Sequence, residues 1–350
     1  MPFDLTLVHT EETTVLPRHT PPSYDLSPER KISYGQELRS RYPNEWPATY
    51  DAYDTWDLDD GGHRADHLES CRSYAWFAIH KQTGAVRVIS SACHLRWCPL
   101  CAEARAAYLA ASVRTWYKSV KHPKLLTLTL KHSDACLTCQ INHLYQSFRR
   151  LRLSSLFRRN VTGGIWFFQI KWNKQTHTWH PHIHALIAGQ YVPQKRIKQL
   201  WLKITSNSEV VDIRSCWSPE SAARHVARYA TRPGTLSSVP PAQRTEFMRT
   251  LHGRRIVGAW GSVRGIPLKP PPAEDKDDWT FFGTWNEVHD KSHTNLNAKA
   301  VLLAWHTNLT VTPDLQLELM EPFKPDQPWL KDAQGNQYYN HSIFTEPVYG

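Results

Sequence analysis

Two strand-like segments, residues 165–172 and 179–188, flank the short polar loop 173–178 in this chain of 350 residues. Runs of this length, rich in β-branched and aromatic residues and joined by a polar loop, predict an antiparallel hairpin. If Trp172 lies opposite Trp179, the two rings share one face of the hairpin and can close it as an aromatic pair. The segment therefore predicts an antiparallel sheet with a definite register.

The same register places two histidines beside a glutamine. Side chains alternate along a strand, so His182 and His184 share one face, and Gln169, opposite His182, joins them. Two imidazoles and an amide oxygen leave open positions for water and a phosphate oxygen, as a catalytic Mg²⁺ or Mn²⁺ site requires. An isolated His-x-His pair is more often a pair of core or surface histidines. The neighbouring segments decide between these interpretations.

Composition favours a polyanionic partner. The chain has 42 Lys and Arg against 32 Asp and Glu, a formal net charge of +10, which is typical of proteins that bind nucleic acid. No apolar run approaches the length of a membrane span, and the first residues do not form a signal peptide. We therefore expect a cytoplasmic protein with no membrane partner.

Composition also divides the chain into four parts. Residues 1–60 form an N-terminal leader without periodicity, expected to be extended or loosely packed, and residues 61–120 hold a Cys-rich segment and a helix. Residues 121–268 contain the hairpin, and residues 269–350 form a linker and a C-terminal tail of unknown role. Within the third part we expect strands at 124–130 and 210–214 and helices after Ser133, over 194–204 and from Ser218.

The helix that begins at Ser218 carries a candidate nucleophile, Tyr229. A tyrosine on a helix is more commonly a half-buried packing residue. Beside a metal ion, however, its phenolic oxygen can attack a phosphodiester once a cation or base draws off the proton. Three cations are placed to bind the flanking phosphates: Lys171, Arg228 and Arg232.

Four cysteines precede the hairpin. Cys98 and Cys101 have the spacing of a zinc knuckle, and Cys71 and Cys93 complete a set of four thiolates, which predicts structural Zn²⁺. Unpaired buried cysteines are the alternative. Three histidines are reserve ligands: His63, His67 and His94.

The remaining cysteines form no predicted site. Cys136 and Cys139 lie at the start of the helix after Ser133, where we expect incidental thiols, and Cys216 stands alone.

Four segments together resemble the rolling-circle replication initiators of the HUH endonuclease superfamily, in the branch found on small bacterial plasmids. With the Cys-rich segment they cover about residues 71–265. In chain order they are Leu126-Thr127-Leu128-Thr129, His180-Pro181-His182-Ile183-His184, Ala227-Arg228-Tyr229-Ala230-Thr231-Arg232, and Leu251-His252-Gly253-Arg254-Arg255 with Gly261 following.

The resemblance implies an α+β fold, in which a central antiparallel five-stranded sheet is flanked by helices and preceded by a Cys-rich zinc-binding element. It also implies metal-dependent nicking of single-stranded origin DNA. Tyr229 would keep the 5′-phosphate and release a 3′-hydroxyl for a host polymerase, and later strand transfer would rejoin the ends. Arg254 and Arg255 would contact DNA, and a host helicase is a further expected partner.

The sequence departs from that family at two positions. Some members have a glutamate four residues before the tyrosine, where this chain has His225, which can act as a base or be a neutral helix residue. The third metal ligand is commonly a carboxylate, and here it is Gln169. Three other functions fit the motifs: a transposase with the same chemistry, a non-catalytic zinc-stabilised DNA-binding regulator, and a metal-dependent phosphodiesterase that uses water.

Overall fold

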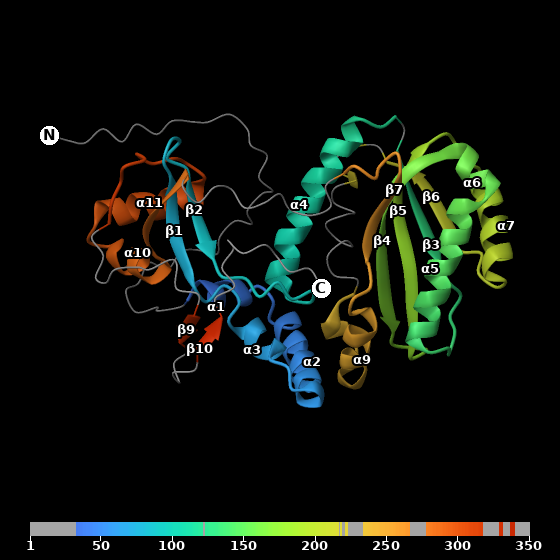
Figure 1. The fold of residues 1–350 in the computed structure, drawn as a ribbon, viewed down its shortest axis with the longest axis horizontal. Coiled ribbons are helices and arrows are strands. Elements are labelled where there is room, and N and C mark those ends of the chain that lie inside the picture. Colours follow the sequence, from blue (N-terminus) through green and yellow to red (C-terminus); the bar gives the residue numbers. More distant parts are fainter. Residues whose placement is uncertain are drawn as a thin grey trace. The chain divides into compact units, whose positions relative to one another are not determined.

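The computed structural model in Figure 1 describes residues 33–121, 123–216, 218, 221–222, 234–266, 278–317, 329–331 and 337–339. The chain forms two compact units. The larger unit contains residues 44–65 and the described residues from 95 to 266. The smaller unit contains the described residues 33–43, 66–94, 278–317, 329–331 and 337–339. Within the described ranges, none of the helices has both the length and the apolar character of a membrane span.

An antiparallel sheet of five strands is the centre of the larger unit, with the order β6-β3-β5-β4-β7. The strands are β3 (Lys124–Thr129), β4 (Val161–Asn173), β5 (Thr178–Gly189), β6 (Val211–Ser215) and β7 (Val257–Gly261). With helices on both faces, this sheet confirms the predicted α+β fold.

The predicted hairpin register is confirmed. Trp172 pairs with Trp179 and Gln169 pairs with His182, and the two indole rings lie edge to face with centroids 4.8 Å apart. Pro181 does not interrupt the β3–β5 ladder, because that ladder ends at the pair Thr129–His182. A proline is therefore tolerated in a strand that is otherwise central in the sheet.

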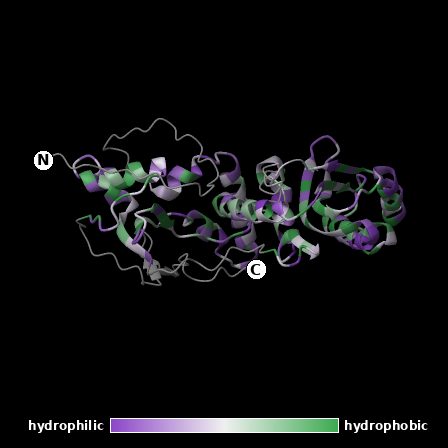
Figure 2. Ribbon diagram, turned by 90° about the horizontal axis from the view of Figure 1, so that it is seen from above, coloured by the Kyte–Doolittle hydropathy of each residue, from purple (hydrophilic) through white to green (hydrophobic). Residues whose placement is uncertain are grey.

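Three helices cover one face of the sheet: α5 (Leu137–Leu153), α6 (Ser155–Asn160) and α7 (Gln194–Thr205). Leu144, Phe148 and Leu151 of α5 are buried, and Phe148 and Tyr145 pack edge-on against Trp166 of β4. Trp201 of α7 is fully buried and its indole N–H donates to the carbonyl of Thr129. In Figure 2 the strands of this sheet are largely hydrophobic, and the hydrophilic residues of this unit lie mainly on its helices.

The opposite face is covered at one end by α4 (Pro99–Lys118). Val113 and Trp116 of α4 pack with Phe167 and Leu186 of the sheet. Phe167 pairs with His184, so this is the face that carries the histidines. A glycine is required at the end of β7, because a Cβ on Gly261, whose φ is +62°, would lie 2.1 Å from the carbonyl of Thr162.

Residues 33–60 differ from the extended leader that composition predicts, because they form α1 (Tyr34–Arg39) and α2 (Glu45–Asp60). Trp46, Tyr53 and Trp56 are buried along α2, which packs against α9 (Pro241–Leu251). Acidic residues lie between these aromatic residues in the sequence, so the apolar periodicity of the helix is difficult to recognise from the sequence. The 3-10 helix η1 (Leu236–Ser238) also packs against α2, and the short helix α3 (Arg64–Glu69) follows α2 in the chain.

The smaller unit is built on a three-stranded antiparallel sheet with the order β2-β1-β8. Its strands are β1 (Ala75–His80), β2 (Val86–Ser90) and β8 (Trp279–Thr284). The helices α10 (Trp285–Lys291) and α11 (Leu296–Thr307) pack on one face, where Phe77 stacks on Trp285 at 5.5 Å between centroids. The strands β9 (Trp329–Lys331) and β10 (Gln337–Tyr339) form a separate pair.

Candidate functional site

The three predicted metal ligands converge on one point of the sheet. Gln169 extends from β4, and His182 and His184 extend from β5; the two imidazoles are 6% and 8% exposed. Nε2 of His184 lies 3.0 Å from Oε1 of Gln169, and Nε2 of His182 contacts the same oxygen. Two imidazole nitrogens and one amide oxygen thus face one another in a buried setting.

The outer nitrogens of both imidazoles contact protein oxygens. Nδ1 of His182 lies 3.1 Å from the carbonyl of His180, and Nδ1 of His184 lies 3.0 Å from the hydroxyl of Thr127 on β3. Contacts of this kind fix the tautomer and the ring orientation of histidines that bind metals. Thr127 belongs to the first predicted motif, so the structure brings that motif into contact with the histidine-bearing strand.

The protonation state of His182 fits a cation at this point. Burial lowers the pKa of His182 to about 4, so the ring is neutral near pH 7. A carbonyl oxygen only accepts, so Nδ1 of His182 carries the proton and Nε2 presents a lone pair toward the amide oxygen of Gln169. A cation between them would satisfy both acceptors, and imidazole nitrogens with an amide oxygen are ligands that a divalent ion such as Mn²⁺ can take.

Two further side chains lie beside these ligands. Lys171 pairs with His180 across the hairpin, on the face that carries Gln169 and His182. His132, in the loop after β3, stacks on His180 with centroids 4.5 Å apart. His132 is absent from the predicted site. The only signal for it in the sequence is its position, three residues after β3, the strand that pairs with the histidine-bearing strand β5.

The predicted nucleophile segment is described only at its two ends. Tyr229, His225, Arg228 and Arg232 lie outside the described residues. At the start, the hydroxyl of Ser218 accepts a hydrogen bond from the backbone N–H of Ser221 at 3.1 Å, as an N-cap does.

Both ends of the segment are attached to the larger unit. Ala222 is fully buried and packs with Phe167 and Leu186, on the histidine-bearing face. At the other end, Gly234 lies against β4, where a Cβ would come within 3.0 Å of the carbonyl of Ile170.

A buried carboxylate holds the chain just after this segment. Glu45 of α2 is 7% exposed, and its two oxygens accept hydrogen bonds from the backbone N–H groups of Leu236 at 2.9 Å and Ser237 at 3.1 Å. The hydroxyl of Ser237 donates a third at 2.8 Å. Sequence reasoning missed Glu45, because it is one of many acidic residues in its region.

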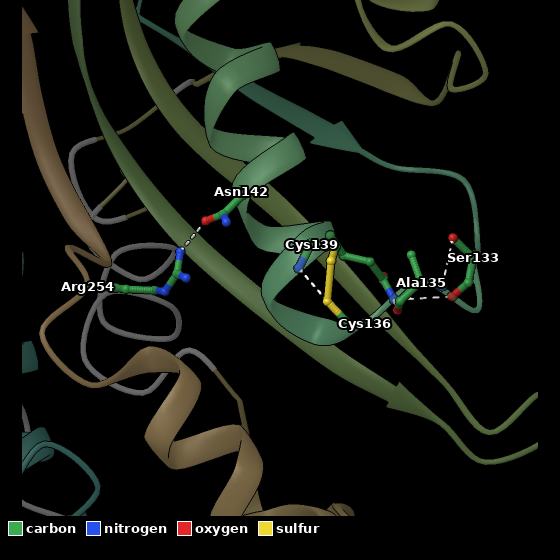
Figure 3. The surroundings of a disulfide bond; sticks show 7 residues. Ser133, Ala135, Cys136, Cys139, Asn142 and Arg254 are labelled. Carbon is green, nitrogen blue, oxygen red and sulfur yellow. Dashed lines mark hydrogen bonds between the residues drawn. A yellow bond between two sulfur atoms is a disulfide. The ribbon is translucent and has the colours of Figure 1, made fainter.

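The two arginines of the last motif contact the helical layer instead of the histidine-bearing face. Arg254 donates to the side-chain oxygen of Asn142 on α5 at 2.6 Å (Figure 3). The carbonyl of Arg255 accepts from the hydroxyl of Tyr145 at 2.8 Å. Tyr145 packs on the opposite side of the sheet from His182. Arg254 therefore does not lie with Lys171.

The four predicted zinc ligands come together. The Sγ atoms of Cys71, Cys93, Cys98 and Cys101 all lie within 4.8 Å of one another, and three of these cysteines are buried. Zinc–sulfur bonds of about 2.3 Å in a tetrahedron require sulfur atoms about 3.8 Å apart, so the cluster can hold one metal ion.

The prediction of incidental thiols at Cys136 and Cys139 is wrong, because these residues form a disulfide with Cα atoms 5.1 Å apart (Figure 3). Cys136 is the N-cap of α5, and its sulfur also accepts from the backbone N–H of Cys139 at 3.1 Å. The N-cap and third helical positions are adjacent in space, which brings the two sulfurs together. Ser133, the predicted cap, accepts instead from the N–H of Ala135.

Comparison with known proteins identifies the family. The profile of the replication protein family matches residues 87–310, so the chain belongs to this family, and the resemblance inferred from the four motifs is confirmed. A protein rep of Staphylococcus aureus is 28% identical over 171 residues, which cover 44% of this chain and 74% of that protein. A protein rep of Streptococcus pneumoniae serotype 2 is 27% identical over 226 residues, covering 57% of this chain and 70% of that protein.

The match to other relatives is less extensive. A protein rep of a Bacillus species is 28% identical over 167 residues, covering 43% of this chain. The chain spans about half the length of the Bacillus relatives it matches, 54% and 50%. No solved structure matches the chain.

Proposed function

We propose that this protein initiates plasmid rolling-circle replication by nicking one strand of the origin DNA. The observation that carries the proposal is the convergence of His182, His184 and Gln169 on one point of the sheet, within a chain of the replication protein family. A divalent metal bound there would polarise the scissile phosphate and stabilise the charge that develops on it.

Tyr229 is the proposed nucleophile. Its phenolic oxygen forms a bond to phosphorus, and the bond from phosphorus to the 3′-oxygen of the preceding nucleotide breaks. The 5′-phosphate stays on the tyrosine, and the departing 3′-oxygen takes up a proton and becomes the primer for a host polymerase. The phenolic proton goes to a base, for which His225 is the proposed residue.

Rejoining of the strand is the reverse of the cleavage step, with one bond to phosphorus formed and one broken. A 3′-hydroxyl attacks the phosphotyrosine, the phosphodiester is restored and the tyrosine leaves, so that strand transfer requires no ATP. Lys171, exposed on the ligand side of the hairpin, is proposed to bind a flanking phosphate, as are Arg228 and Arg232. Arg254 and Arg255 are proposed to contact DNA beyond the cleavage site.

The cysteine cluster is proposed to bind structural Zn²⁺. Four thiolates within 4.8 Å of one another suit a closed tetrahedral site with no position for a substrate. Loss of this ion is expected to lower the melting temperature, whereas loss of the catalytic metal is expected to leave the fold intact. Equal melting temperatures before and after the cysteine-bound metal is removed would count against the zinc assignment.

Metal dependence of cleavage tests the proposed site. Single-stranded origin oligonucleotide is incubated with Mn²⁺ and resolved on a denaturing gel. Wild type should form a covalent adduct, and the His182→Ala/His184→Ala variant should form none while keeping its melting temperature. Tyr191→Phe, a change at an exposed tyrosine elsewhere in the unit, is the matched control.

The outcomes separate the remaining functions. Cleavage without an adduct indicates hydrolysis by water, and duplex binding without cleavage in any metal indicates a regulator. Adduct formation at transposon ends in preference to a plasmid origin indicates a transposase.

A further inference from the structure

One segment of the chain accounts for its net positive charge. Residues 135–208 contain 11 Lys and Arg and no Asp or Glu, whereas the other 276 residues contain 31 basic and 32 acidic residues. The formal net charge of +10 thus originates in about a fifth of the chain. A segregation of this kind within one folded unit produces a strong local field.

The structure concentrates these charges on the helical layer α5–α6–α7. Nine of the eleven basic residues lie on these three helices, and eight of the nine are exposed. The remaining two, Lys171 and Lys174, lie on the hairpin. The nine are Arg149, Arg150 and Arg152 on α5, Arg158 and Arg159 on α6, and Lys195, Arg196, Lys198 and Lys203 on α7.

No ion pair within the described part of the chain neutralises these nine residues, whereas other arginines of the same unit are paired. Arg64 lies 2.8 Å from Asp57, and Arg249 lies 2.5 Å from Asp59. On the helical layer the neighbours are like charges instead: burial and the nearby Arg149 and Arg264 together lower the pKa of Arg152. An anion bound to this surface would reduce the repulsion between these like charges.

The apolar side chains of the layer favour a duplex over a single strand. Single-stranded DNA is held by aromatic rings on which its bases stack. On these helices Phe148, Phe157 and Trp201 are buried and Tyr145 packs against Trp166, so no described Phe, Tyr or Trp ring on them is exposed. The surface offers cations without stacking platforms, which suits the phosphates of a double helix.

We propose that the outer surface of α5, α6 and α7 binds the phosphate backbone of duplex DNA, on the opposite side of the sheet from His182 and His184. This surface rests on the proposed function and extends it, because the duplex part of the origin would bind to a surface separate from the cleavage site. The single strand to be nicked is then engaged on the histidine-bearing face, and the same sheet separates the two tasks.

The test measures duplex binding without any divalent metal, by fluorescence anisotropy over a series of salt concentrations. The Arg158→Gln/Arg159→Gln variant removes two exposed cations of α6. The plot of log affinity against log salt should lose about 0.9 in slope for each phosphate contact, hence about 2 for the pair. Lys81→Gln/Lys299→Gln, which removes two exposed lysines of the smaller unit, is the control and should change neither slope nor affinity.

Three results would overturn the proposal: an unchanged slope in the α6 variant, an equal change in the control, or tighter binding of phosphatidylserine vesicles than of the duplex. The test is independent of the nicking chemistry. If origin cleavage fails but the α6 variant loses duplex affinity, the duplex-binding surface is supported and the proposed function is rejected. Equal melting temperatures of variant and wild type show that binding, and not folding, has changed.

Discussion

Replacing Glu45 with alanine should destabilise the larger unit and displace the chain that follows the nucleophile segment. The carboxylate is buried and accepts three hydrogen bonds, two of them from the backbone N–H groups of Leu236 and Ser237. These residues begin seven positions after Tyr229. Their attachment to α2 fixes where that segment ends.

The magnitude follows from the three contacts. A hydrogen bond to a charged group contributes about 1.5–3 kcal/mol, and a buried donor left without a partner costs about 1–3 kcal/mol. The Leu236 N–H is the donor whose bond to Glu45 is buried, and the two donors of Ser237 are partly exposed. We therefore expect Glu45→Ala to lower the free energy of unfolding by about 3–5 kcal/mol. Glu45→Gln, which keeps one acceptor oxygen, should cost about half as much.

Urea unfolding followed by tryptophan fluorescence measures the stability, and single-turnover adduct formation measures the positioning effect. Asp54→Ala, an exposed acidic residue of the same helix, is the control and should lie within about 0.5 kcal/mol of wild type. In Glu45→Gln the rate of adduct formation should fall more than the affinity for the oligonucleotide. A loss of less than 1 kcal/mol in Glu45→Ala, about what one exposed hydrogen bond contributes, would show that the carboxylate does not hold residues 236 and 237 in place.

Three other predictions follow from single contacts. Thr127→Val should weaken Mn²⁺ binding about tenfold, because His184 loses the partner of its Nδ1, and Thr127→Ser should restore it in a calorimetric titration. Cys136→Ser/Cys139→Ser should cost about 2 kcal/mol under oxidising conditions, from closure of a four-residue loop, and nothing in excess reductant. Burial lowers the pKa of His289 to about 4, so its neutral form stabilises the fold above about pH 6.5 and this stability is lost as the pH falls from 6.5 to 4. His289→Gln should flatten that part of the stability profile measured by thermal melting, and an unchanged profile would contradict the assignment.

The hairpin and the convergence of its three candidate ligands were predictable because strand geometry has a period of two. Once Trp172 faces Trp179, the position of every other pair follows, and the structure has Gln169 opposite His182. Cys93, Cys98 and Cys101 were predictable as a group because their short spacing keeps their side chains close, and Cys71 was the one upstream cysteine that could complete the set of four.

Other features depend on contacts between distant segments. The sheet of the smaller unit pairs β1 with β8, about 200 residues further along the chain, so local patterns cannot reveal it. The contact of Glu45 with residues 236 and 237 has the same origin. The Cys136–Cys139 disulfide depends on the position at which α5 begins. The sequence predicted Ser133 as the N-cap of this helix, whereas the N-cap is Cys136.

Peptide mapping of the DNA adduct by mass spectrometry tests the central claim most directly. Wild-type protein is incubated with single-stranded origin DNA and Mn²⁺, the DNA is digested, and the modified tryptic peptide is sequenced. We expect a nucleotide 5′-phosphate on Tyr229 and no adduct in Tyr229→Phe. A nucleotide on any other residue, or an undiminished adduct in Tyr229→Phe, would contradict this expectation.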